Sequence, residues 1–371
     1  MAVGVDRVLV LNAGSSSLKW SVLSSRTEEV LAGADIPYTS VAGGGRGALV
    51  RRALDLAGEV SAVGFRVVHG GTLFRESVRV DRAMLARLAT LNELAPLHNP
   101  VAVDCMAAAL DALPEALHVA AFDTAFHRTI PDKAATYAIP SEWTERWGIR
   151  RFGFHGLSVA YAVQQSGLIL GRIPPRHVVC HLGAGCSVTA VRDGKSIDTS
   201  MGFTPLDGVM MATRSGAVDP GMMLFLVRHG TEVDEFYDTL ENRSGLLGVS
   251  GISGDLRAVI DQADSGNKFA QLACDMFLYS VTRAVGSMAA TLGGIDALTF
   301  TGGVGEHQPP LRQHVVDALR YLDVALDARA NLAGVVDQDH SDPRSPVRVL
   351  VIKAREDLTI LREVIAVASR A

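Results

Sequence analysis

The sequence predicts an α/β protein of two similar domains, each built on a mixed β-sheet. Three observations lead to this prediction. The chain has 371 residues, which is long for one domain and suits two. A strand, a turn of small residues and a returning strand occur twice, first from Val8 and again from His177. Apolar residues at helical spacing separate and follow these units, so both halves of the chain combine strands with helices.

The first strand–turn–strand unit surrounds the turn at 12–19, Asn-Ala-Gly-Ser-Ser-Ser-Leu-Lys. The apolar run at 8–11 and the apolar positions of 18–23 are typical of buried strands. The turn offers backbone N–H groups, small side chains and one cation, which are the requirements for holding a phosphate chain. It lacks the second glycine and the following helix of a Walker A loop. It resembles instead the strand-joining phosphate loops of sugar kinases, actin and heat-shock chaperone ATPases, and the alternative is an ordinary Ser-rich hairpin turn.

The second unit has the same plan. Residues 177–191 give a strand, a glycine-rich turn and a returning strand. The repeat predicts a duplication, with two domains facing one nucleotide. We expect 1–124 plus 358–371 to form the first domain, with the first phosphate loop, and 125–357 to form the second.

The remaining elements follow from apolar spacing and from residues that begin or end helices. They are a helix from Asp81 to Pro96, an Ala-rich helix at 101–113, a surface loop at 43–47, a strand at 297–300, a glycine-rich turn at 301–306 and a last helix at 356–369. Asp81 is a capping residue, and the two acidic residues that begin the last helix suit a helix N-terminus.

Composition and charge exclude several classes of partner. Hydrophobic residues make up 48% of the chain and charged residues 20%, as in a globular protein with large cores. The net charge of −5 gives no basic excess for nucleic acid or an anionic membrane. The four cysteines show no zinc spacing and are expected as reduced thiols. Because there is no signal peptide and no apolar run long enough to cross a membrane, we expect a cytoplasmic protein.

Several charged and titratable residues lie in loops that are flanked by glycine or proline residues. They are Arg66, His69, His98, Asp123, His127, His155 and Arg214. Alone, such a histidine is more often a loop residue with one hydrogen bond, and such an arginine is more often a surface charge. Together with two phosphate turns, they fit the transfer of a phosphoryl group onto another anion.

The chain resembles the acetokinase family along nearly its whole length. The resemblance rests on ten blocks in order, at residues 12–19, 65–72, 94–100, 122–127, 152–156, 181–187, 199–216, 254–257, 301–306 and 356–361. It implies two duplicated actin-like (ribonuclease H-like) domains, as in the superfamily of acetate and sugar kinases, chaperone ATPases and actin. It also implies a homodimeric phosphotransferase that moves a phosphoryl group directly and reversibly from ATP to acetate, giving acetyl phosphate and ADP. Mg²⁺ is the implied metal, with Mn²⁺ as an alternative.

The resemblance also assigns roles to residues. The implied catalytic residues are Arg66, Asp123, His155, Arg214 and His98, and the implied metal-binding residues are Asn12 and Glu356. Nucleotide contacts are implied at Ser17, Lys19, His181, Gly183, Ala184, Gly185, Asp255, Leu256, Arg257, Gly303, Val304, Gly305 and Glu306. Arg66 would bind the acetate carboxylate, and the methyl group would contact Val68, Leu97, Phe154 and Pro205. Since these side chains leave little volume, we expect acetate to be preferred over propionate.

Four positions depart from the family's pattern. Ala184, His307 and Arg355 each stand where Asn is usual, and Val159 replaces a second histidine. These departures leave the choice of phosphoryl donor open. A propionate kinase is the nearest alternative function. The others are a catalytically weakened paralogue that binds nucleotide or acyl phosphate, and a chaperone-like ATPase.

Overall fold

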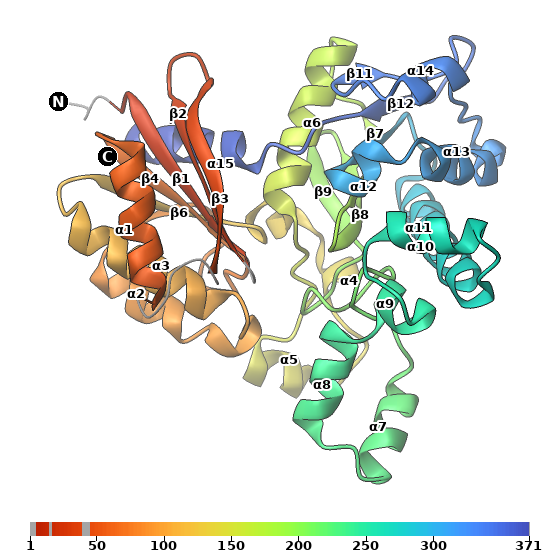
Figure 1. Ribbon diagram of the computed structural model, residues 1–371, viewed down its shortest axis with the longest axis horizontal. Helices are drawn as coiled ribbons and strands as arrows, with labels where there is room; N and C mark the ends of the chain where they lie inside the picture. Colours follow the sequence, from red (N-terminus) through yellow and green to blue (C-terminus); the bar gives the residue numbers. More distant parts are fainter. Residues whose placement is uncertain (1–4, 15–16, 39–44, 371) are drawn as a thin grey trace. The chain divides into compact units, whose positions relative to one another are not determined.

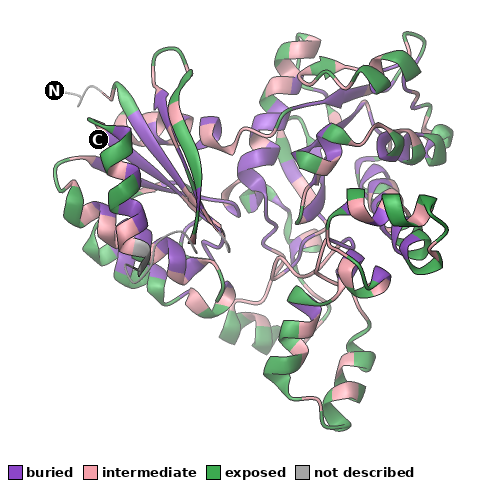
Figure 2. Cartoon of the chain, in the orientation of Figure 1, coloured by how far each residue is buried: buried purple, intermediate pink, exposed green. Residues whose placement is uncertain are grey.

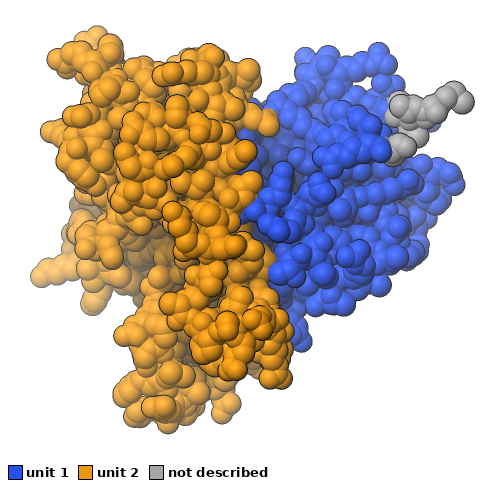
Figure 3. Space-filling model, turned by 180° about the vertical axis from the view of Figure 1, so that it is seen from behind, with its two compact units in different colours: residues 1–128, 154–161, 355–371 blue, residues 129–153, 162–354 orange. Residues whose placement is uncertain are grey.

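The computed structural model describes residues 5–14, 17–38 and 45–370. The chain forms two compact units (Figure 3). The first unit contains Met1–Arg128, Phe154–Tyr161 and Arg355–Ala371, and the second contains Thr129–Gly153 and Ala162–Ala354. The domain bounds expected from the sequence, 1–124 plus 358–371 and 125–357, stay a prediction.

The first unit is built on a six-stranded sheet of order β3-β2-β1-β4-β6-β5 (Figure 1). The strands are β1 (Arg7–Ala13), β2 (Ser17–Ser24), β3 (Val30–Pro37), β4 (Ala62–Val67), β5 (Val78–Arg79) and β6 (Leu117–Phe122). The helices are α1 (Gly45–Ala57), α2 (Arg82–Ala89), the 3₁₀ helices η2 (Asn92–Leu94) and η3 (Ala125–Thr129), α3 (Asn99–Ala112) and α15 (Glu356–Ala368). β1 pairs antiparallel with β2 and parallel with β4, and β4 pairs parallel with β6.

Alternation along β4 explains how both faces of this sheet are covered. Val63, Phe65 and Val67 are buried in a hydrophobic core with residues of α1, α2 and α3. Gly64 faces the other side of the pleat, where a Cβ would lie 2.5 Å from a side-chain carbon of Ile360 in α15. The absence of a side chain at Gly64 therefore lets the last helix pack closely on the sheet.

The second unit is built on a six-stranded sheet of order β11-β12-β10-β7-β8-β9. The strands are β7 (Arg176–Leu182), β8 (Cys186–Arg192), β9 (Lys195–Thr199), β10 (Ala297–Thr301), β11 (Gln338–Asp339) and β12 (Arg348–Val351). The helices are α4 (Asp132–Ala135), α5 (Ser141–Trp147), α7 (Pro220–Arg228), α8 (Val233–Asn242), α9 (Gly245–Ser250), α10 (Leu256–Asp264), α11 (Lys268–Leu292), α12 (Gly302–His307), α13 (Pro309–Ala318), η4 (Arg320–Leu322) and α14 (Ala328–Ala333). Helix α6 (Gly156–Leu170) begins in the first unit and continues in the second.

The two sheets have the same topology. In each, an antiparallel hairpin leads to a third strand, and the first strand of the hairpin pairs parallel with a later strand, β4 in one sheet and β10 in the other. The pairing of second and third strands also shifts register at equivalent places, at Val22/Leu23 and at Ala190/Val191. The duplicated α/β fold predicted from the two strand–turn–strand units is therefore confirmed.

Asp81 begins α2 as predicted, and its Oδ1 accepts a hydrogen bond from the backbone N–H of Met84 at 2.7 Å. The predicted end of this helix at Pro96 is wrong, because the helix stops at Ala89. The Thr90 hydroxyl donates to the carbonyl of Arg87 at 2.7 Å, which satisfies a carbonyl of the last turn.

Two predicted loops are also wrong in part. Gly45 already begins α1, so 45–47 is helical, and 43–44 lie outside the described residues. The glycine-rich stretch after β10 is not a turn, because Gly302 begins α12 directly. Gly302 has a φ of +80°, and a Cβ there would lie 2.7 Å from the carbonyl oxygen of Leu182. Only glycine allows so abrupt a change from strand to helix at this place.

Burial follows the two sheets, whose central strands lie under the helices (Figure 2). All four cysteines are free and buried, as expected for reduced thiols. Among the helices of the described residues, none combines the length and the apolarity that crossing a bilayer requires.

Candidate active site

In the first unit, three polar side chains lie at one edge of the sheet. Asn12 is near the end of β1, Arg66 is near the end of β4, and Asp123 directly follows β6. These three strands are parallel neighbours, so their carboxyl ends meet at one edge. Ligand sites of α/β sheets occur at this kind of edge.

Arg66 and Asp123 form a bidentate ion pair. Nη2 of Arg66 lies 2.6 Å from Oδ2 of Asp123, and Nε lies 3.1 Å from Oδ1. The Asp123 side chain is 1% exposed and that of Arg66 is 17% exposed, so the pair is shielded from water while the guanidinium keeps an open side. Such paired hydrogen bonds fix the plane of the guanidinium.

Asn12 and Glu356 complete this cluster. Nη1 of Arg66 donates to Oδ1 of Asn12 at 3.2 Å, and Nδ2 of Asn12 donates to Oε2 of Glu356 at 3.1 Å. Oε2 of Glu356 also lies 3.6 Å from Nε of Arg66. Glu356 reaches the edge because it is the first residue of α15, which packs on the same sheet. The four residues therefore form one continuous polar network.

The network holds Arg66 and Asp123 in their charged forms at neutral pH. Burial alone would lower the pKa of Arg66, but the charges of Asp123 and Glu356 and the hydrogen bond to Asp123 raise it above its usual range. Burial raises the pKa of Asp123 to about 6 against the opposing charge and hydrogen bonds of Arg66, and the charge of Glu356 adds to the rise. A guanidinium has five N–H groups, and the hydrogen bonds to Asp123 and Asn12 use three of them. Within the described residues, two N–H groups of Arg66 are thus left to receive an anion.

His155 lies beside this network in a constrained backbone position. It is 9% exposed and has a left-handed φ of +58°. Its backbone N–H donates to the Asp123 carboxylate, which lowers the pKa of that group. The next amide, of Gly156, donates to the Asp123 carbonyl at 2.9 Å, and a Cβ at Gly156 would lie 2.1 Å from that oxygen. A glycine is therefore required to bring His155 close to Asp123.

The residues expected around the acetate methyl group differ in burial. Val68 and Phe154 are buried in the first unit, at 7% and 1% exposure, while Leu97 is 42% exposed. The ring of His69, also buried, makes an edge contact with Phe154, with centroids 5.2 Å apart. Pro205 belongs to the second unit and is half-buried.

Asn99 is a structural residue that follows His98 in the sequence and hydrogen-bonds to the backbone of His69. His98 precedes α3 as its N-cap residue. Asn99 accepts from the backbone N–H of His69 at 3.2 Å and donates to its carbonyl at 3.0 Å. This fully buried Asn99 fixes the loop that begins at His69, and no local pattern marks it out in the sequence.

The first turn predicted to bind phosphate is described only in part, because Ser15 and Ser16 lie outside the described residues. The backbone N–H of Gly14 donates to the carbonyl of Ser17 at 2.9 Å, which closes the turn. Lys19 lies on β2, is exposed, and has its Nζ 3.9 Å from Asp35 on β3.

In the second unit, the second turn predicted to bind phosphate contacts the segment that carries Arg214. The turn is closed by a hydrogen bond of 3.0 Å from the Gly183 N–H to the Gly185 carbonyl, and Ala184 is exposed. The backbone N–H of Ala212 donates to the Ala184 carbonyl at 3.1 Å. A Cβ at Gly254 would lie 3.1 Å from the Ala212 carbonyl oxygen, so the predicted nucleoside segment adjoins the same place.

Arg214 pairs with Glu241, a residue that sequence reasoning missed. Nε of Arg214 lies 2.6 Å from Oε1 of Glu241, which is buried in α8. Backbone N–H groups of Leu246 and Leu247 in α9 donate to the carbonyls of Met211 and Ala212. These contacts hold the Arg214 segment in place. Glu241 has no distinctive sequence signal, because an acidic residue on an amphipathic helix is usually solvated.

The predicted adenosine segment forms helix α12 at the end of β10. Gly303 is exposed, and a Cβ added to it would meet no atom within 4 Å, so a ligand can approach its backbone closely. Glu306 is buried, and its Oε1 accepts from the Ala354 N–H at 2.9 Å. His181 is half-buried on β7, opposite Thr301 of β10. The two glycine-rich segments therefore lie at one edge of the second sheet.

Arg312 is a second residue that sequence reasoning missed. It is fully buried and donates to the carbonyls of Gly305 and Glu306, both at 2.8 Å, and to Oδ1 and the carbonyl of Asn331. These acceptors are neutral, and burial lowers the pKa of Arg312 to about 10. A buried cation is retained here at the carboxyl end of α12, the place that the helix dipole favours.

The remaining predicted nucleotide residues have structural partners. Oδ1 of Asp255 caps α10 by accepting from the backbone N–H of Arg257 at 3.0 Å, and their side chains also pair. Leu256, the first residue of α10, is buried. Within the described residues, no three His, Cys, Asp or Glu side chains form a group that could hold a metal ion.

Comparison with known proteins agrees with these features. The sequence profile of the acetokinase family matches residues 47–362. An acetate kinase from Nostoc punctiforme is 45% identical over 312 residues, which cover 83% of this chain and 77% of that protein.

Two solved structures are similar over nearly their whole length. An acetate kinase from Porphyromonas gingivalis matches with a TM-score of 0.88 at 34% identity, covering 98% of this chain and 99% of that one. A propionate kinase from Francisella tularensis matches with a TM-score of 0.90 at 35% identity, covering 96% and 98%. The extent and identity of these matches show that the protein belongs to the acetokinase family.

Proposed function

We propose that this kinase transfers a phosphoryl group directly and reversibly between ATP and acetate. The observation that carries the proposal is the network of Arg66, Asp123, Asn12 and Glu356 at the edge of the first sheet. Within the part of the chain that the structure describes, it presents an oriented cation with two unused N–H groups beside a carboxylate. This arrangement suits two anions that must react with each other.

The chemistry needs charge neutralisation more than proton transfer. Acetate is already ionised at neutral pH, so the nucleophile requires no general base. The difficulty is the approach of a carboxylate to a phosphoryl group, and positioned cations reduce it. Arg66, held by Asp123, binds the acetate carboxylate, and Arg214, held by Glu241, stabilises charge on the transferring group. His155 donates a hydrogen bond to that group in the transition state.

Mg²⁺ fits the donors of the first unit. Glu356 and Asn12 offer only oxygen ligands, and Mg²⁺ is commonly held by one or two protein ligands together with phosphates and water. A site with so few protein ligands agrees with the finding that, among the described residues, no three His, Cys, Asp or Glu side chains form a metal-binding group. Bound Mg²⁺ would neutralise charge on the phosphates. Glu356 and Asn12 would hold it, and Mn²⁺ is the alternative metal.

The nucleotide is assigned to the second unit. The backbone of the 183–185 turn suits the phosphates, and the open backbone at Gly303 suits the adenosine. Ala184 supplies no side-chain donor, so the peptide groups of this turn carry the interaction. Because Ala184, His307 and Arg355 depart from the family's pattern, the identity of the phosphoryl donor requires a direct assay.

A propionate kinase is the second candidate, because the similar Francisella structure bears that name. The buried Val68 and Phe154 favour the smaller acid, since a large apolar pair leaves little volume for an added methylene.

The test is an acyl-hydroxamate assay that crosses ATP, GTP and pyrophosphate with acetate, propionate and butyrate, with and without EDTA. We expect hydroxamate from ATP and acetate, loss of it with EDTA, and its return with excess Mg²⁺. Product only with propionate would assign the second candidate. No product from any pair would contradict the kinase activity.

We also propose a cytoplasmic homodimer. Support for the dimer comes from exposed apolar side chains in the second unit, Leu224 and Phe225 on α7 and Phe269 and Leu272 on α11. Phe225→Asp and Phe269→Asp should shift the sedimentation profile to monomer. The control, Leu332→Asp, replaces an exposed leucine on α14 and should leave the sedimentation profile unchanged. A wild-type monomer at micromolar concentration would contradict the proposal.

A further inference from the structure

The side chain of Arg151 binds the backbone where the chain leaves β9 in the second unit. Its Nη1 donates to three successive carbonyls, at 3.0 Å to Thr199, 3.2 Å to Ser200 and 3.1 Å to Met201. Successive carbonyls of an extended strand point in opposite directions, so three that converge on one nitrogen mark a sharp change in the course of the chain. Carbonyl dipoles that point to one place repel one another, and the positive charge of Arg151 offsets this repulsion.

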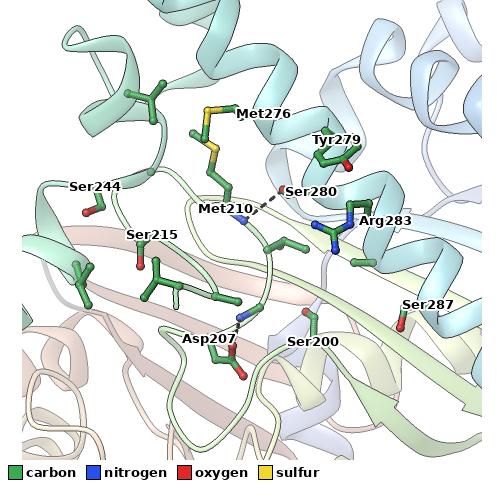
Figure 4. Close-up of a pocket in the computed structure, with 18 of the residues that line it drawn as sticks. Ser200, Asp207, Met210, Ser215, Ser244, Met276, Tyr279, Ser280, Arg283 and Ser287 are labelled. Atoms are coloured by element: carbon green, nitrogen blue, oxygen red, sulfur yellow. Dashed lines mark hydrogen bonds between the residues drawn. The ribbon is translucent and has the colours of Figure 1, made fainter. Parts of the chain in front are cut away.

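Two carboxylates lie farther from the same guanidinium. Asp198 is 3.8 Å from Nε and Asp207 is 3.7 Å from Nη1, and both distances exceed that of a hydrogen bond. Asp207 instead accepts the backbone N–H of Gly208 at 2.8 Å (Figure 4). The short contacts of Arg151 are therefore with the main chain, and they hold the beginning of the 199–208 segment.

Tyr137 contacts the same part of the segment. Its ring centroid lies 5.7 Å from the guanidinium carbon of Arg151, and its hydroxyl accepts the backbone N–H of Phe203 at 2.8 Å. A Cβ at Gly202 would lie 2.2 Å from the Tyr137 hydroxyl oxygen and 2.4 Å from Oδ2 of Asp207. Because Gly202 has no side chain, the segment can lie against both groups.

The backbone around Arg151 is itself fixed. The N–H of Arg151 donates to the carbonyl of Ala135 at 2.7 Å, and the N–H of Phe152 donates to the carbonyl of Gly202 at 3.0 Å. The main chain that carries Arg151 is thus bonded directly to the segment that the guanidinium holds. A displacement of residues 199–203 would break several contacts at once.

The 199–208 segment carries Pro205, a residue expected beside the acetate methyl group. The Thr204 hydroxyl accepts the N–H of Leu206 at 3.3 Å, which turns the chain around Pro205. Gly208 has a φ of +103°, and a Cβ there would lie 2.8 Å from the carbonyl oxygen of Ser200. The two ends of the segment therefore lie together, and Pro205 stands in the loop between them. Small displacements of a group that contacts substrate have large effects on turnover, so the support of this loop matters.

We propose that Arg151 is a positioning residue for the acid substrate: it fixes the 199–208 segment, and through Pro205 it sets the preference among short-chain carboxylates. The fixing of the segment stands apart from the proposed function, and only the effect on substrate choice rests on it.

Amide hydrogen exchange on the full chain tests the fixing of the segment. In Arg151→Ala, peptides that cover 199–208 should exchange at least about fivefold faster than in wild type, the effect of about one lost hydrogen bond. Peptides of β7 should exchange as in wild type. Arg151→Lys should stay near the wild-type rate, because an ammonium also offers three donors to the carbonyls.

Two further variants complete the exchange experiment. Tyr137→Phe removes only the acceptor of the Phe203 N–H and should also speed exchange in the segment, so it serves if Arg151→Ala does not fold. The matched control is Arg192→Ala, which removes an exposed arginine that donates to the carbonyl of Leu292 at 3.1 Å. It should leave exchange in 199–208 unchanged.

Substrate choice is tested in the acyl-hydroxamate assay. We expect Arg151→Ala to raise the KM for acetate by about tenfold, with the KM for ATP within about twofold of wild type. The ratio of kcat/KM for acetate over propionate should fall by about fivefold or more, since one methylene is then discriminated less well. Tyr137→Phe should change the ratio in the same direction, and Arg192→Ala should not change it.

Unchanged exchange in both Arg151→Ala and Tyr137→Phe, or exchange in Arg151→Lys as fast as in Arg151→Ala, would overturn the fixing of the segment by the Arg151 charge. Faster exchange with an unmoved acid ratio, or equal rises in the KM for acetate and for ATP, would overturn the effect on substrate choice. A wild-type protein that phosphorylates none of the acids would contradict the proposed function and leave the exchange result standing.

Discussion

The Asp123 carboxylate accepts hydrogen bonds from two nitrogens of Arg66, with Nη2 2.6 Å from Oδ2 and Nε 3.1 Å from Oδ1. The same carboxylate accepts the backbone N–H of His155. Asp123 thus orients a side chain and a backbone segment at once. Its role in the proposed reaction is to position Arg66.

We expect Asp123→Asn to lower kcat by at least about a hundredfold, the effect of losing one preorganised charged donor. The variant keeps the shape of the side chain but removes the charge that fixes Arg66. Arg66→Lys should behave similarly, since an ammonium cannot make the bidentate contact. Steady-state kinetics with ATP and acetate measures both.

A matched control is Asp296→Asn, which changes the bidentate partner of Arg176 in the second unit, with Nη2 2.6 Å from Oδ1. Its kcat should stay within about threefold of wild type, as for a partly exposed ion pair outside the site. An Asp123→Asn enzyme as active as this control would show that the pair is structural.

Substitutions in the pair of Arg214 and Glu241 should lower kcat to different extents. Arg214→Ala removes the cation and should lower kcat by about a hundredfold. Glu241→Gln keeps a hydrogen-bond acceptor at the same distance and should lower it by about tenfold, because Arg214 is less firmly placed. A larger loss in Glu241→Gln than in Arg214→Ala would contradict this order of roles.

Arg312 should affect the nucleotide more than acetate. Arg312→Lys cannot span the carbonyls of Gly305 and Glu306 and those of Asn331 at once, so α12 should be held less firmly. We expect the KM for ATP to rise by about tenfold with the KM for acetate unchanged, which corresponds to about one lost hydrogen bond. Arg320→Lys, at an exposed position, is the control. Equal rises in both KM values would indicate a general loss of structure.

Val68 should set the choice between acetate and propionate. One methylene in a tight apolar pocket changes discrimination by roughly 1–3 kcal/mol. Val68→Ala should therefore narrow or reverse the ratio of kcat/KM for the two acids. Val67→Ala is the control, because Val67 is buried in the core on the other side of the strand and should alter stability only. A wild-type preference for propionate, or an unmoved ratio, would refute the pocket assignment.

Two buried histidines predict how stability depends on pH. Burial lowers the pKa of His177 to about 3 and that of His127 to about 4, from an ordinary 6.5. Below pH 6.5 the unfolded chain binds protons that the folded chain does not, so stability falls as the pH drops from 6.5 toward 4. Each histidine contributes about 1.4 kcal/mol per pH unit in this window.

The urea midpoint, measured from pH 4.5 to 7, checks this expectation. His177→Gln should remove one proton from the pH dependence of the urea midpoint. The control variant is His314→Gln, which changes an exposed histidine on α13. If His177→Gln leaves the pH dependence of the urea midpoint unaltered, this histidine has the same pKa in the folded and the unfolded chain.

Much of the fold and part of the site followed from the sequence. The strands around 12–19 and 183–187, the cap at Asp81 and the duplication depend on patterns a few residues long, which local sterics and burial decide. The sequence predicts Arg66 and Asp123 as functional residues because charged loop residues occur together with two phosphate turns, which fits phosphoryl transfer onto an anion. The resemblance to a known family added their roles.

The tertiary structure decided which residues pair with the charged residues of the candidate site. Glu241 lies 27 positions from Arg214, and Asn331 lies 19 from Arg312, so only the packing of separate helices brings them together. By itself the sequence determined the two strand–turn–strand units, the strand at 297–300 and the charged residues of the loops. Only the folded chain decided how those charges are paired, because pairing depends on distances that chain topology sets and local patterns do not record.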